Sequence, residues 1–120
     1  MIKWYQLFWK LLKKAKTPLI LPLDFDYEVM NEMELNNLII EYDIKELYYK
    51  AEIFDCDDFA WVFKGLASKR KIQPVGLVIG RRKGIWHCWN VVITEKGTYF
   101  IEPQTGRIVE KGYKAWIIII

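Results

Sequence analysis

Phe54-Asp55-Cys56-Asp57-Asp58-Phe59-Ala60 is the stretch from which the fold can be read, because it places a cysteine in the first turn of a helix. Asp55 can cap that helix, two further acids fill its first turn, and three basic residues follow at 69–71. Apolar residues recur at helical spacing through 59–67, so one face is expected to pack on a core. The Cys56 sulfur belongs to that face, where helical N–H groups point outward.

Helical patterns also precede this stretch. Residues 2–16 carry a polar stripe at helical spacing. Asn31 and Glu34 form a cap with its reciprocal acid for a second helix, and the capping pattern recurs at residues 43–46. The proline-containing segment 17–23 cannot continue a helix and is expected to run extended across the surface.

The chain changes character after residue 71, where β-branched and aromatic runs alternate with glycine-containing turns. Because the connections are short, neighbouring strands are expected to be antiparallel. The sequence predicts a single α+β domain over residues 1–120, helical over 1–71, with an antiparallel sheet of four or five strands over 72–120. The predicted strands are 75–79, 85–94, 98–102, 107–109 and 113–120.

Composition narrows the function classes. A formal charge of +3 over 120 residues, with no basic stripe, argues against a nucleic-acid partner. Two cysteines without a CxxC motif, and no recognisable secretory leader, predict free thiols and a cytoplasmic location. No window approaches the roughly 20 apolar residues needed to cross a bilayer. For the helix at 2–16 we favour packing on the domain's own core over contact with a membrane surface or a partner protein.

One constellation of residues suggests chemistry. His87, the only histidine, lies in the strand 85–92, and Glu102 ends the next strand. A turn at 95–97 places residues whose numbers sum to about 191 opposite one another, and His87 and Glu102 sum to 189. Their Cβ atoms are then about 5 Å apart if they share a face. A base oriented by a carboxylate, facing the Cys56 thiol, is the arrangement that thiol acyl chemistry needs.

Four segments, in order, carry a family resemblance: Asp55-Cys56-Asp57-Asp58-Phe59-Ala60, Pro74 to Gly80, His87-Cys88-Trp89-Asn90-Val91-Val92, and Tyr99 to Gly106. Together they resemble the transglutaminase-like cysteine peptidase superfamily, relatives of the papain-like fold. The resemblance implies a helix-and-sheet core with a Cys56-His87-Glu102 triad. It implies a thioester formed with a protein or peptide substrate, which water or an amine then resolves, and no metal or organic cofactor. The competing prediction is a catalytically inactive, transglutaminase-like binding module.

Four further residues are candidate substrate contacts. Trp86 and Trp89 flank the histidine and either fill the core or wall a substrate groove. Asp57 either belongs to the solvated face at the helix start or contacts a basic acceptor substrate. Gln104 could polarise an oxyanion, although the backbone N–H of Cys56 is the better candidate.

Cys88 is relevant to an alternative to the triad, a zinc site that includes His87 and Cys88. Strand alternation places Cys88 on the face opposite His87, so we expect core packing for this thiol. The same alternation argues against a zinc site built from both residues.

Overall fold

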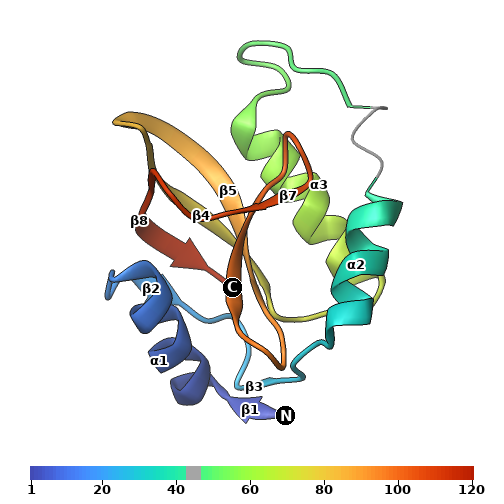
Figure 1. The fold of residues 1–120 in the computed structure, drawn as a ribbon, viewed down its shortest axis with the longest axis vertical. Helices are drawn as coiled ribbons and strands as arrows, with labels where there is room; N and C mark the ends of the chain where they lie inside the picture. Colours follow the sequence, from blue (N-terminus) through green and yellow to red (C-terminus); the bar gives the residue numbers. More distant parts are fainter. Residues whose placement is uncertain (43–46) are drawn as a thin grey trace.

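The computed structural model describes residues 1–42 and 47–120 (Figure 1). The predicted capping pattern at 43–46 lies outside the described residues. Helices and strands alternate only loosely along the chain, with the longer strands all in its second half. The elements are β1 (Ile2–Lys3), α1 (Trp4–Ala15), β2 (Ile20–Leu21), β3 (Asp26–Tyr27), α2 (Glu32–Glu41), α3 (Cys56–Lys69), β4 (Val75–Arg82), β5 (Ile85–Ile93), β6 (Thr98–Glu102), β7 (Arg107–Val109) and β8 (Tyr113–Ile119).

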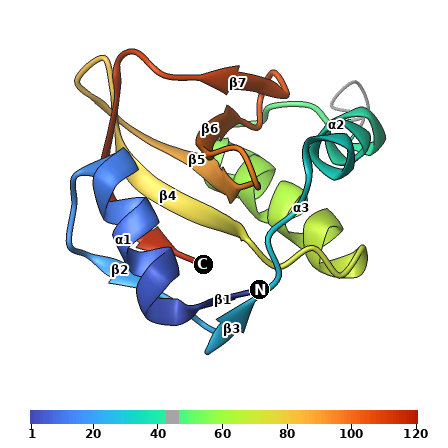
Figure 2. The ribbon, with the colours of Figure 1, turned by 60° about the horizontal axis from the view of Figure 1, so that its bottom comes forward.

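A six-stranded mixed sheet forms the centre of the molecule, in the order β2-β8-β4-β5-β6-β7. Figure 2 follows this sheet from β4 through β5 and β6 to β7. The predicted sheet of four or five antiparallel strands is therefore wrong. Ile20 and Leu21, in the segment expected to be a surface connector, pair in parallel with Ile118 and Ile119 of β8. The prolines around this pair limit it to two residues without preventing its hydrogen bonds.

The register between β5 and β6 agrees with the prediction. Asn90 pairs with Ile101 and Val91 with Phe100, so opposed residue numbers sum to 191. This register puts His87 and Glu102 on one face as diagonal neighbours.

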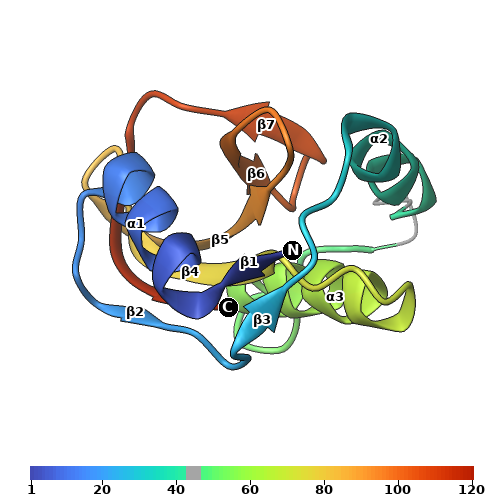
Figure 3. The ribbon, with the colours of Figure 1, turned by 90° about the horizontal axis from the view of Figure 1, so that it is seen from below.

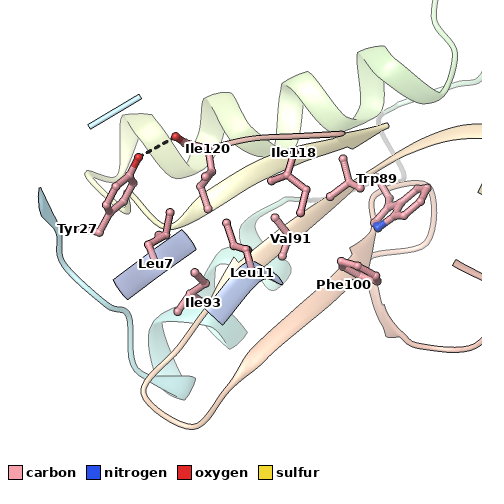
Figure 4. Packing of buried hydrophobic residues seen from close by; sticks show 10 residues of the cluster. Leu7, Leu11, Tyr27, Trp89, Val91, Ile93, Phe100, Ile118 and Ile120 are labelled. Carbon is pink, nitrogen blue, oxygen red and sulfur yellow. Dashed lines mark hydrogen bonds between the residues drawn. The ribbon is translucent and has the colours of Figure 1, made fainter. Parts of the chain in front are cut away.

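The sheet is covered on both faces (Figure 3). On one face, Leu7 and Leu11 of α1 pack with buried residues of β5 such as Trp89 and Val91 (Figure 4). On the other, α2 and α3 form a second core, in which Phe63 packs with sheet residues. Alternate side chains of β5 therefore face different helices, and this alternation decides which groups can meet.

α3 begins at Cys56, as the sequence predicts. The backbone N–H of Asp55 donates to the Asp58 carboxylate at 3.1 Å, which satisfies one of the N–H groups at the helix entrance. Asn90 fastens the helix to the sheet, because its Nδ2 donates to the carbonyls of Ala60 and Gly76, each at 3.0 Å. The position of the Cys56 thiol over β5 follows from these contacts.

Only one side of α1 packs on the core. Leu7 and Leu11 are fully buried, as expected, whereas Trp4, Tyr5 and Trp9 remain exposed. Among the described residues, no helix is long and apolar enough to span a membrane.

Candidate functional site

The two cysteines lie together between α3 and β5. Cys56 and Cys88 are both free and half-buried, and they line one shallow pocket. Burial raises the pKa of the Cys88 thiol to about 12, and the neighbouring Cys56 thiol adds to this shift. Cys88 faces α3, as Asn90 does two residues further along the strand.

His87 points to the opposite face of β5. Its Nε2 lies 2.5 Å from Oε1 of Glu102, and both side chains are buried. The Glu102 carboxylate also accepts from Arg82 Nη1 at 3.2 Å, the Tyr113 hydroxyl at 3.0 Å and the backbone N–H of Gln104 at 3.1 Å. Burial alone would raise the pKa of Glu102, but the hydrogen bonds from His87, the Gln104 N–H and Tyr113 outweigh it and hold the pKa below its ordinary value.

The predicted triad is brought together only in part. His87 and Glu102 meet as predicted, and Cys56 and His87 both line the shallow pocket. In the described part of the chain, however, no hydrogen bond joins the Cys56 thiol to the His87 ring. That ring lies parallel to Trp89, with centroids 6.1 Å apart and planes 25° apart, on the face covered by α1. The thiol's neighbour is instead Cys88, on the face covered by α3.

The predicted substrate contacts fall into different environments. Trp86 is 55% exposed at the rim of the pocket, whereas Trp89 is fully buried in the core. Gln104 is bound through its backbone N–H to Glu102. Asp57 is exposed at the start of α3, away from the core.

Asp57 belongs to an acidic cluster with Asp55 and Asp58, whose carboxylate oxygens lie within 4.8 Å of one another. A hydrogen bond that the protonated Asp55 donates to Asp57, followed by burial and the charges of the neighbouring carboxylates, raises the pKa of Asp55 to about 6. These are the described residues best placed to share a cation. Because acids at a helix start also complement the helix dipole, we assign no metal to them.

A second aromatic residue completes a surface that the sequence analysis missed. Trp116 of β8 is 54% exposed, and its ring centroid lies 5.7 Å from that of Trp86, with 69° between the planes. The Arg81 guanidinium lies 4.8 Å from the Trp86 centroid. We call Trp86, Trp116, Arg81 and Lys114 the tryptophan platform.

The sheet register builds this platform. Arg81 on β4 pairs with Trp86 on β5 and with Lys114 on β8, so the three side chains project from one face in a row. All four platform residues line a common surface pocket. The predicted strand ended at residue 79, before Arg81, but β4 extends to Arg82. The sequence signal that could have indicated this platform was the alternate spacing of Lys114 and Trp116 in β8.

The comparisons with known proteins point to lectins. A family model described as the ricin-type beta-trefoil lectin C-terminal domain matches residues 22–120. A Polyporus squamosus lectin structure, bound to the human-type influenza-binding epitope Neu5Aca2-6Galb1-4GlcNAc, matches with a TM-score of 0.83 and 24% identity, over 97% of this chain and 48% of that one. A structure described as a PSL1a-E64 complex matches with a TM-score of 0.81 and 24% identity, over 99% and 51%. Among curated proteins, none matches the sequence.

These findings correct the predicted family, fold and function. The matching family model and the lectin structure replace the transglutaminase-like or papain-like assignment. The same findings also correct the predicted function. They contradict the cysteine peptidase or acyltransferase, its protein or peptide substrate and the inactive transglutaminase-like alternative. The reason for the error lies in β5: the residue types occur in the right order, but alternation turns the His87 ring away from the face on which Cys56 meets Cys88. At this identity the structural likeness describes the fold, and the chain spans about half the length of each matched chain.

Proposed function

The chain belongs to the family of ricin-type beta-trefoil lectin C-terminal domains, and from this premise we propose that it binds glycans through the tryptophan platform. The observation that carries the proposal is the pair Trp86 and Trp116, two large aromatic rings in mutual contact that both remain more than half exposed. Two adjacent exposed tryptophans place apolar surface in water without contributing to a core. Exposed apolar patches of this kind mark ligand-binding or partner-binding sites.

The chemistry of the platform suits a pyranose ring. One face of a pyranose presents C–H groups that pack on an aromatic ring, while its hydroxyl groups project around the edge. Trp86 and Trp116 supply the aromatic surface, and each indole also has an N–H donor. The ligand would then lie on β5 and β8, across the end of β4.

The cations beside the tryptophans add polar recognition. Arg81 stacks on Trp86, and this contact holds a guanidinium at the rim of the platform. Lys114 lies beside it on the next strand. Both side chains donate hydrogen bonds only, so they complement the oxygen-rich edge of a sugar.

The lectin relatives support a glycan ligand. The Polyporus squamosus lectin is described as bound to a sialylated trisaccharide. Because this chain spans about half of that protein, the ligand of the whole lectin comes to this chain only as part of the proposal.

The test is glycan-array screening of the full chain, followed by calorimetric titration with the best ligand. We expect Trp86→Ala and Trp116→Ala each to raise the Kd about tenfold or more, because a buried aromatic contact often contributes about 2 kcal/mol to binding. Trp61→Ala is the matched control, since Trp61 is 56% exposed on α3 and lies outside the platform.

Two results would overturn the proposal. The first is failure of the folded parent protein to bind any glycan on the array. The second is an unchanged Kd in Trp86→Ala, with the melting temperature preserved, which would move the glycan site elsewhere.

A further inference from the structure

The outward face of α1 is unusual for a helix that packs on a core. Tyr5, Trp9 and Lys13 follow one another at intervals of four residues and form a stripe on the solvent side. Tyr5 is 51% and Trp9 61% exposed. The opposite side of the helix holds the core contacts of Leu7 and Leu11. The exposed aromatics are therefore not needed for packing.

Further apolar surface adjoins the start of the helix. The backbone N–H of Trp4 donates to the Phe25 carbonyl at 2.8 Å, which fixes the segment before β3 beside the first turn of α1. Phe25 is 80% and Leu23 62% exposed. The exposed apolar surface thus extends beyond the helix itself.

The charge on α1 has one sign. The helix sequence contains no acidic residue, and Lys10, Lys13 and Lys16 are exposed along or just beyond it. Among the residues that the structure describes, none of these three lysines takes part in an ion pair. Exposed aromatic rings are therefore accompanied by uncompensated positive charge.

We propose that α1 lies flat on the surface of an anionic lipid bilayer, with Tyr5 and Trp9 at the level of the headgroups and the lysines over lipid phosphates and carboxylates. Tryptophan and tyrosine favour this interface because one part of each ring system is apolar and another can hydrogen-bond. Lysines near a negatively charged leaflet strengthen the attachment.

An anionic surface fits this face better than a second copy of the chain. Two copies of α1 facing each other would bring the same lysines together, and the like charges would repel. With 12 residues, α1 is also too short to cross the hydrocarbon core, so it can only lie on it.

The experiment is co-sedimentation of the full chain with vesicles that contain no sugar. One set is phosphatidylcholine alone, and the other is phosphatidylcholine mixed with phosphatidylserine. We expect about tenfold or stronger binding to the mixed vesicles at low salt, weakened as salt is added. Trp9→Ser and Lys13→Glu should each reduce that binding several-fold. Trp61→Ser, with a similarly exposed tryptophan on α3, should bind like the parent.

The outcomes separate this inference from glycan binding, because the vesicles carry no glycan. Equal binding to both kinds of vesicle, or parental binding by a folded Trp9→Ser variant, would overturn it. Concentration-dependent dimerisation without lipid that is lost in Trp9→Ser would also overturn it, since a second copy would then occupy this face. Each variant's fold is checked by circular dichroism.

Discussion

One oxygen atom of Glu102, Oε1, accepts hydrogen bonds from both His87, at 2.5 Å, and Tyr113, at 3.0 Å. Because Tyr113 starts β8 and His87 lies in β5, the carboxylate on β6 links strands that are not neighbours in the sheet. The buried charge is held by donors from several directions, as a buried carboxylate requires.

Glu102→Gln should therefore lower the free energy of unfolding at neutral pH by about 3 kcal/mol, because it removes the charge that the surrounding donors neutralise. The folded-state pKa of Glu102 lies below its ordinary value. Its contribution to stability is consequently present above the unfolded pKa and is lost as pH falls through the folded pKa. Urea unfolding across the acidic pH range should show a shallower pH dependence in the variant. The exposed control Glu110→Gln should change stability by less than about 0.5 kcal/mol.

Gly80→Ala should destabilise the domain by about 3 kcal/mol or more. A Cβ at Gly80 would meet the Lys114 carbonyl oxygen at 2.1 Å and the Trp89 ring at 2.7 Å, next to the irregularity between β4 and β8. Gly65→Ala is the matched control, because a Cβ there meets nothing within 4 Å, and alanine in a helix should add up to about 1 kcal/mol. Thermal melting compares the two, and equal melting temperatures would contradict the close approach at Gly80.

Tyr27→Phe should cost roughly 1–3 kcal/mol, because it removes a buried hydrogen bond to the Ile120 carbonyl and leaves the backbone N–H of Asp24 without its partner. The Tyr27 hydroxyl accepts from the N–H groups of Leu23 and Asp24, each at 3.0 Å, and donates to the Ile120 carbonyl at 2.8 Å (Figure 4). Hydrogen exchange should show faster amide exchange at Asp24, whereas the amide of Leu23 also donates to the Ile120 carbonyl at 2.6 Å and should keep its protection. Unchanged protection at Asp24 would contradict this role of the hydroxyl.

The two thiols should differ in reactivity. Burial and the neighbouring thiol raise the pKa of Cys88 to about 12, so it remains protonated at neutral pH, and thiolate is the form that iodoacetamide alkylates. With sub-stoichiometric reagent we expect modification mainly at Cys56, mapped by mass spectrometry. Cys88→Ser should leave the extent of labelling nearly unchanged, whereas preferential modification of Cys88 in the parent would refute the assignment.

Local structure was the predictable part of this molecule. The start of α3 at Cys56 and the register of β5 against β6 both agree with the sequence, because capping chemistry and a short turn act over a few residues. The pairing of Ile20 with Ile118 could not be foreseen, since nothing near either residue indicates a partner almost a hundred positions away.

The predicted triad is assembled only in part for a similar reason. Alternation correctly separates His87 from Cys88, but it does not say which face of β5 the Cys56 helix covers. That choice depends on tertiary packing, in which Asn90 on the Cys88 face bonds to α3. The tryptophan platform was missed because Trp86, Arg81 and Lys114 become neighbours only through the pairing of three strands. The cytoplasmic location stays a prediction.

The parallel pairing of β2 with β8 also bears on how the chain folds. Leu7 and Leu11 share a core with Ile118 and Ile120, so α1 acquires this part of its packing only after the last strand is available. Contacts between such distant segments require a large loop to close, which slows folding. During synthesis the helix would leave the ribosome with its leucines uncovered and wait for β8. During this interval, more than in the folded protein, α1 is exposed to aggregation or to binding by a chaperone.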